Sequence, residues 1–189
     1  REDPNPLSSA PQILGTPGQR FRVVPLKGLV RPWALAFLPN GDMLVTERVG
    51  RLRIVRDSVL DPEPISGIPT VLLNRYQGLW DVALHPRFEE NHLAHFTYSK
   101  PNPDERLPPG SDASGTAVLA RGRYDGSHAL TDVQDIFVSN GWNSSAAAAR
   151  IVFGRDGKIY MATGVPLRDR EHGGTQRVGT AESAQDPGS

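Results

Sequence analysis

The fold is decided by residues 33–47, which read WALAFLPNGDMLVTE. An apolar run over 33–38 leads into the turn PNGD at 39–42, and a second apolar run follows at 43–47. Asn-Gly between two apolar runs is a strong signal for a β-hairpin, because both residues tolerate a positive φ. A third run, RLRIV at 51–55, alternates basic and apolar residues, as a strand with one wet face does. These residues predict three successive antiparallel strands.

The same pattern recurs twice further along the chain. Residues 80–98 read WDVALHPRFEENHLAHFTY, and residues 150–163 read RIVFGRDGKIYMAT. Each instance is an apolar strand, a turn with glycine or proline, and a second apolar strand. Further strands are predicted at 116–124 and 135–138. The instances begin roughly 45 to 70 residues apart, and this spacing is typical of propeller blades with inserted loops.

Composition narrows the class of protein. Lys and Arg total 21 and Asp and Glu total 21, so the basic excess of a nucleic-acid-binding protein is absent and no nucleic acid partner is expected. There are no cysteines, which excludes disulfides and thiolate metal sites. No apolar run reaches the roughly 20 residues of a membrane-spanning helix. His92 and His95, three apart on a predicted strand, face opposite sides and make no metal pair.

Three ordered motifs resemble one known family. They are PWALAFLPNG at 32–41 with TER at 46–48, GLWDVALHP at 78–86 with FTYS at 96–99, and RIVFGRDGKIY at 150–160. In this order and at this spacing, they resemble the soluble PQQ-dependent glucose/sorbosone (aldose sugar) dehydrogenases. The resemblance implies an all-β chain that supplies roughly the first half of a six-bladed β-propeller. Residues 1–20, rich in proline, are predicted to be an irregular arm, and residues 21–189 the partial propeller.

The resemblance also implies a chemistry, which this sequence meets only in part. The family removes a hydride from a sugar hydroxyl onto the quinone PQQ, with a histidine base helped by an aspartate. The histidine position is Ala146 here, the neighbouring aspartate position is Ser145, and a later aspartate position is Val165. Alanine and valine accept no proton, so no catalytic residue is assigned. The alternative is a catalytically inactive propeller with a binding or structural role.

Candidate cofactor contacts follow from the same resemblance. The family often has glutamine and two glycines before the second motif, where this chain has Tyr76, Gln77 and Gly78. Tyr76 and Gln77 are therefore candidates for a contact to the cofactor. Arg170 is a third candidate, because it follows a strand end at which the family places active-site residues; exposure or local salt bridging is the alternative. No metal ligand is assigned in this chain.

The resemblance further implies PQQ and calcium as cofactors, with most ligands outside this chain, and a periplasmic or secreted location. A small sugar is the implied substrate. A partial propeller leaves blade faces and strand edges open. We therefore expect a missing carboxy-terminal half, or a second chain, to complete the ring.

Overall fold

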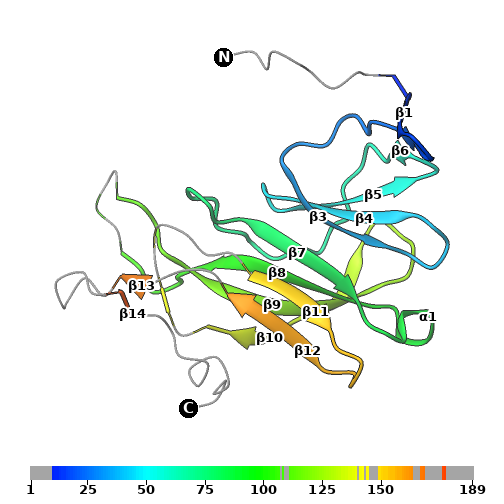
Figure 1. Cartoon of the computed structure of the whole chain (residues 1–189). Helices are drawn as coiled ribbons and strands as arrows, with labels where there is room; N and C mark the ends of the chain where they lie inside the picture. The colour runs from blue at the N-terminus through cyan, green and yellow to red at the C-terminus, as the bar shows by residue number, and fades with distance from the viewer. Residues whose placement is uncertain are drawn as a thin grey trace.

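The computed structural model describes residues 10–106, 108, 111–139, 141, 142, 144 and 149–163, and the backbone of two short strands, Leu167–Arg168 (β13) and Gln176–Arg177 (β14). In these parts of the chain, almost all regular structure is antiparallel β-sheet (Figure 1). None of the helices described there is long and apolar enough to cross a membrane.

The first sheet, blade 1, contains β3 (Pro32–Phe37), β4 (Met43–Glu47), β5 (Arg51–Arg56) and β6 (Val59–Leu60), paired in sequence order. The predicted turn closes β3 onto β4, since the N–H of Leu38 donates to the carbonyl of Asp42 at 2.8 Å. Gly41 in this turn has a φ of 90°, which glycine adopts without steric cost. The three predicted strands are confirmed, and β6 adds a short fourth.

The second sheet, blade 2, also has four strands in sequence order. These are β7 (Leu79–Leu84), β8 (Leu93–Pro101), β9 (Gly115–Tyr124) and β10 (Leu130–Val138). A single helical turn, α1 (Phe88–Asn91), joins β7 to β8. A hairpin of β11 (Ala149–Phe153) and β12 (Ile159–Thr163) follows. We call the first strand of each sheet, β3, β7 and β11, its inner strand. The three inner strands are neighbours, with β7 lying between β3 and β11.

The main core fills the seam between blades 1 and 2. Its residues are apolar side chains from both sheets that are at most 9% exposed: Leu38, Leu44, Leu52, Ile54, Ile65, Leu79, Val82, Ala94, Phe96, Tyr98, Val118, Ala120, Tyr124 and Leu130. They alternate along each strand with residues that face the other side, because successive side chains of a strand point to opposite faces. Burial of this continuous apolar surface holds the two sheets together.

Two threonines connect successive inner strands across the seams. Thr46 Oγ accepts the N–H of Ala34 in its own sheet at 3.0 Å and donates to the carbonyl of Trp80 in blade 2 at 2.5 Å. Thr97 repeats the arrangement, accepting from the N–H of Asp81 at 3.1 Å and donating to the carbonyl of Ala149 at 2.8 Å. Both threonines are fully buried. The sequence repeat is therefore also a repeat of inter-blade hydrogen bonds.

The two tryptophans that begin repeats differ in their surroundings. Trp80 is fully buried and packs between blade 2 and the β11–β12 hairpin. Trp33 is 41% exposed, and Leu35 and Phe37 on the same face of β3 are exposed as well. A segment before β3 lies against part of this blade, since a Cβ on Gly28 would lie 3.0 Å from Leu60. The face of β3 that carries Trp33, Leu35 and Phe37 has no neighbouring sheet among the described residues, whereas the opposite face packs on blade 2.

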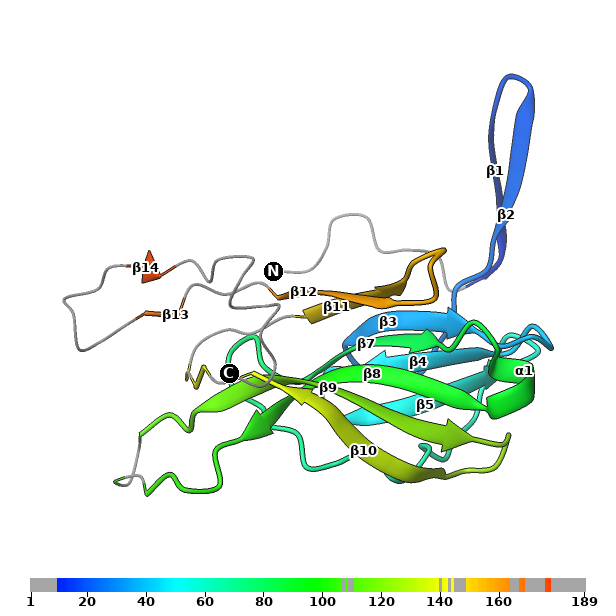
Figure 2. The same ribbon diagram turned by 90° about the horizontal axis from the view of Figure 1, so that it is seen from below.

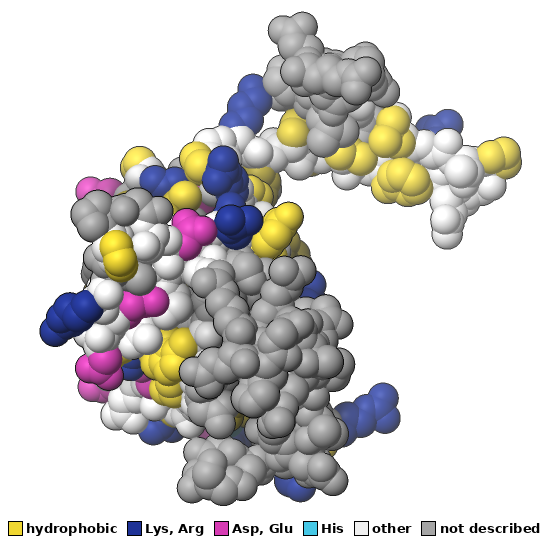
Figure 3. All heavy atoms as spheres, turned by 90° about the vertical axis from the view of Figure 1, so that its left-hand side faces the viewer, with side chains coloured by type: hydrophobic (Ala, Val, Ile, Leu, Met, Phe, Trp, Pro, Cys, Tyr) yellow, Lys and Arg dark blue, Asp and Glu magenta, His cyan; other side chains and the backbone are white. Residues whose placement is uncertain are grey.

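A hairpin precedes blade 1. Strands β1 (Gln12–Thr16) and β2 (Gln19–Val23) pair with each other and project away from both blades (Figure 2). Figure 3 shows hydrophobic side chains exposed on this projecting arm. The prediction that residues 1–20 are irregular is wrong for β1, because Pro17-Gly18 makes a tight turn with a φ of 95° at Gly18. The boundary of the propeller near residue 21 stays a prediction.

Candidate functional site

The inner strands all begin at the same end of the molecule. The N–H of Arg48, at the end of β4, donates to the carbonyl of Arg31, and the N–H of Leu79 donates to the carbonyl of Arg48. The first residue of β11, Ala149, lies beside the start of β7 through the Thr97 hydrogen bond. We call this the loop end. It comprises the described residues of the segments that enter β3, β7 and β11 and of the β4–β5 and β8–β9 connections: 28–31, 48–50, 74–78, 102–106, 108, 111–114, 139, 141, 142 and 144.

One asparagine ties three loops together at the loop end. Asn74 Nδ2 donates to the carbonyl of Ser144 at 2.7 Å and lies 3.3 Å from the carbonyl of Ala113. Arg75 forms an exposed ion pair with Asp112 at 3.4 Å across the same junction. The segment that enters β7 is therefore held against the segments that enter β9 and β11. Sequence reasoning missed Asn74, because its partners are backbone carbonyls distant in sequence.

The structure separates the two candidate cofactor residues of this segment. The side chain of Tyr76 is 66% exposed, while its carbonyl accepts the indole N–H of Trp80 at 3.2 Å. Gln77 is fully buried, and its carbonyl accepts a hydrogen bond from Arg48 Nε at 3.1 Å. Tyr76 is thus the side chain of the pair that a ligand at the loop end can reach. Arg170, the third candidate, lies outside the described residues, as do Ser145, Ala146 and Val165.

A buried carboxylate fixes the start of β11. Asp81 is 5% exposed; its Oδ1 accepts the N–H of Val82 at 3.0 Å, and its Oδ2 accepts the N–H of Ile151 at 2.8 Å. Arg150 Nε lies 3.7 Å from the same Oδ2, and the Arg150 side chain is 79% exposed. Arg150 therefore presents a cation to solvent close to the loop end. The aspartate was visible in the second repeat, but nothing in the sequence indicated its partner 70 residues away.

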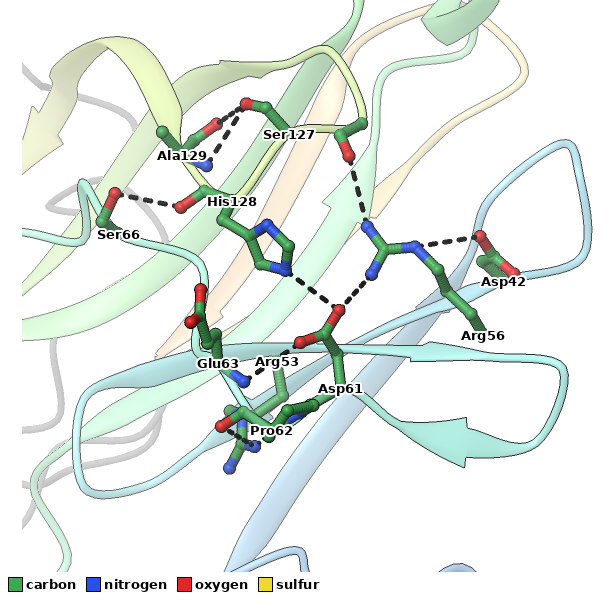
Figure 4. Close-up of polar contacts among 11 residues, drawn as sticks. Asp42, Arg53, Arg56, Asp61, Pro62, Glu63, Ser66, Ser127, His128 and Ala129 are labelled. Carbon is green, nitrogen blue, oxygen red and sulfur yellow. Dashed lines mark hydrogen bonds and ion pairs between the residues drawn. The ribbon is translucent and has the colours of Figure 1, made fainter.

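A second polar cluster lies at the outer edge of the seam between blades 1 and 2, away from the loop end (Figure 4). Asp61 Oδ2 contacts Arg56 Nη1 at 2.5 Å and His128 Nε2 at 2.9 Å, and Arg56 also donates to the carbonyl of Gly126. The hydrogen bond with His128, and then the N–H of Glu63, hold the pKa of Asp61 below its usual 3.8. The His128–Asp61 contact and the Arg56–Gly126 hydrogen bond cross the seam, so we interpret this cluster as structural.

The described fold and loop end agree with one family. The family model described as Glucose / Sorbosone dehydrogenase matches residues 29–187. The chain belongs to this family. The match begins before blade 1 and includes both four-stranded sheets and the β11–β12 hairpin.

Two curated relatives give the extent of the similarity. The chain is 43% identical over 146 residues to the uncharacterized protein slr1608 of Synechocystis sp., covering 70% of this chain and 33% of that protein. It is 34% identical over 142 residues to the aldose sugar dehydrogenase YliI of Escherichia coli, covering 72% of this chain and 36% of that protein. The chain thus spans about a third of the length of these curated relatives.

Solved structures support the fold. A crystal structure of a glucose dehydrogenase aligns with a TM-score of 0.63 at 31% identity, over 72% of this chain and 39% of that chain. The apo-form of the soluble aldose sugar dehydrogenase of Escherichia coli aligns with a TM-score of 0.60 at 33% identity, over 70% and 37%. A PQQ-bound aldose sugar dehydrogenase from Streptomyces coelicolor shares the fold at 24% identity, with a TM-score of 0.56 over 84% and 43%. The predicted all-β chain, part of a six-bladed β-propeller, is confirmed.

The loop end offers part of what PQQ requires. PQQ is a flat quinone that carries carboxylates, so an open aromatic ring and a solvent-exposed cation suit it. The exposed ring of Tyr76 and the exposed guanidinium of Arg150 match these needs, whereas the buried Gln77 does not reach solvent. The described residues contain no group of three or more His, Cys, Asp or Glu that could hold a metal ion.

Proposed function

We propose that this chain is part of a PQQ-dependent sugar (aldose) dehydrogenase, which oxidises a sugar hydroxyl by hydride transfer to the quinone. The observation that carries the proposal is the family match over residues 29–187, with both blades and the loop end in place. PQQ, when bound, supplies the hydride acceptor. Tyr76 would lie against the flat ring, and Arg150 would balance carboxylate charge, since both side chains are exposed near the loop end.

A catalytically inactive propeller is the second candidate function. The observation that favours it is the sequence at the family's base position, where Ala146 replaces histidine and cannot accept a proton. Such a protein would keep the blades and the loop end as a binding or structural surface. The two candidates share the fold and differ in whether a sugar is oxidised.

The ring would be completed by further blades. The exposed face of β3, with Trp33, Leu35 and Phe37, supports a neighbouring blade on one side, and exposed Val152 and Tyr160 on the β11–β12 hairpin support one on the other. We propose that the rest of the protein, or a second chain, supplies these blades. Calcium ligands would come from outside the described residues. From the family resemblance we propose a periplasmic or secreted location. Cell fractionation, with detection of the protein by an antibody, tests this location.

The experiment uses the whole protein that contains this chain. It is mixed with PQQ and calcium, and reduction of an electron-accepting dye is followed with several aldoses. Sugar-dependent reduction that a chelator abolishes supports the dehydrogenase. PQQ binding without dye reduction supports the inactive propeller. If PQQ neither binds nor supports dye reduction, a role for PQQ is ruled out.

A pair of variants tests the assigned contact. Tyr76→Ala is expected to raise the PQQ concentration for half-saturation about three- to tenfold, the loss that a stacked aromatic contact gives. Phe21→Ala is the matched control, because Phe21 is also an exposed aromatic residue but lies on β2, in the hairpin that projects away from both blades. Equal effects of the two substitutions would remove Tyr76 from the site.

A further inference from the structure

Blade 2 is held by two seams of different composition. The seam to blade 1 is a continuous apolar core. The seam to the β11–β12 hairpin has a small apolar cluster of Trp80, Ala117 and Ala149, with Met161 packed against it. Much of the remaining contact there is polar and includes the hydrogen bonds of Thr97 and Asp81. The second seam therefore has less apolar burial to stabilise it.

A histidine is buried in this second seam. His95 on β8 is 6% exposed, and its ring packs edge-on against Phe153 of β11, with the ring centroids 5.1 Å apart. His85, directly after β7, stacks on His95 with the ring centroids 6.0 Å apart and packs edge-on against Phe153 at 5.5 Å, so the three rings contact one another. The Nδ1 atom of His95 is buried and has no hydrogen-bond partner among the described residues.

The charged groups around His95 oppose a positive charge on it. Burial acts first, followed by the electrostatic influence of His85 and Arg121, and together they lower the pKa of His95 from 6.5 to about 4. Arg121 is its register partner on β9 and donates to Gln134. In the described part of the chain, no carboxylate forms an ion pair with His95. The closed seam thus favours neutral imidazole.

We propose that protonation of His95 opens the seam between blade 2 and the β11–β12 hairpin in mild acid, while the seam to blade 1 stays closed. A proton on His95 would lie in the seam without an acceptor for Nδ1, and buried unpaired charge is costly. Phe153 packs edge-on against the ring, so its movement away from His95 would open a path from the buried Nδ1 to water and separate β11 from β8. The device is a conformational switch built into one seam of the blade, and it does not depend on the proposed function.

The direction of the pH dependence follows from proton binding. The open state takes up a proton near the ordinary histidine value of 6.5, and the closed state does so only near 4. Stability of the closed seam therefore falls as the pH drops from about 6.5 to about 4 and is level outside that window. One pH unit of difference corresponds to a tenfold change, so a difference of about 2.5 units lowers the closed-to-open ratio by up to about 300-fold.

The first seam has the opposite arrangement. There the histidine, His128, faces a carboxylate, Asp61, at 2.9 Å, and Arg56 and Asp42 complete the cluster. The N–H of Glu63 donates to the carboxylate of Asp61, and Arg53 donates to the backbone carbonyl of Asp61. Asp125 lies in the turn between β9 and β10, where its carboxylate accepts the N–H of Ser127. A positive charge at this position lies beside a carboxylate rather than isolated, so mild acid above about pH 4 does not open this seam.

Trp80 is a built-in reporter of the second seam, because it is fully buried there. These 189 residues contain 3 tryptophans, so in a Trp33→Phe/Trp142→Phe background Trp80 is the one that remains among them. Its emission maximum is recorded from pH 8 to pH 4, together with far-ultraviolet circular dichroism. We expect a red shift with a midpoint between pH 4 and 6.5 while the β-sheet signal is retained.

The variants decide the assignment. His95→Gln is expected to abolish the red shift, and His128→Gln, the matched control in the first seam, is expected to keep it. A red shift that persists in His95→Gln, or one that coincides with loss of the β-sheet signal, would overturn the proposal. Should His95→Gln fail to fold, hydrogen exchange of the unsubstituted chain decides: after correction for intrinsic rates, amides of β11 and β12 must lose protection at pH 5 at least tenfold more than those of β4. Equal losses would also overturn it.

Discussion

The carboxylate of Asp81 is predicted to be the strongest polar link between blade 2 and the β11–β12 hairpin. Asp81→Ala removes the acceptor for the N–H groups of Val82 and Ile151, which lie 3.0 and 2.8 Å from its oxygens. A hydrogen bond to a charged acceptor contributes about 1.5–3 kcal/mol, and a buried N–H left unpaired costs about 1–3 kcal/mol. Since removing a buried carboxylate also removes its desolvation cost, we expect a net loss of about 2–3 kcal/mol.

Urea unfolding at pH 7, followed by the fluorescence of Trp80 in the Trp33→Phe/Trp142→Phe background, measures this loss. With a urea dependence of about 2 kcal/mol per molar, typical of small proteins, the midpoint should fall by about 1–1.5 M. Asp81→Asn should lose less, because the amide oxygen still accepts one of the two N–H groups.

The matched control removes the other partner of the same carboxylate. Arg150 is 79% exposed and lies 3.7 Å from Asp81, so Arg150→Ala should cost less than about 0.5 kcal/mol. If Asp81→Ala cost under about 1 kcal/mol, or if Arg150→Ala cost as much as Asp81→Ala, the reasoning that the backbone hydrogen bonds carry the link would be refuted.

Three further predictions concern the seams. Phe96 is fully buried in the main core, so Phe96→Ala should lower the unfolding free energy by about 3–5 kcal/mol in urea, and a loss near zero would contradict its place there. Thr97→Val removes the donor to the Ala149 carbonyl and the acceptor for Asp81 N–H, and should cost about 1–2 kcal/mol and raise hydrogen exchange in β11; unchanged exchange would argue against an inter-blade role. The pKa of Asp61 is lowered in the folded state, so its contribution is present above about pH 4 and is lost as the pH falls through the lowered value. Asp61→Asn should therefore reduce the melting temperature at pH 7 and leave it unchanged well below pH 4, and an equal loss at both pH values would contradict this assignment.

The sequence by itself determined the strands, their order and the family. The turn PNGD at 39–42 and its counterpart at 154–157 mark hairpins because they contain residues that tolerate a positive φ, a local property of the chain. Alternation of apolar residues located β3 to β5 and β7 to β9, because a strand that packs on a core must repeat every two residues. The β1–β2 hairpin was missed, since proline-rich polar residues predict irregular structure and its pairing buries no core.

Only the tertiary structure decided which equivalent residues are buried. Trp33 and Trp80 occupy the same place in two repeats, yet one is 41% exposed and the other fully buried, because burial depends on the neighbouring blade. Likewise Tyr76 is open to solvent and Gln77 beside it is not, although both were equal candidates in the sequence. The partners of Asn74, Asp81 and His95 come from other loops and strands. Periodicity along one strand carries no information about them, since such contacts form only when separate sheets pack together.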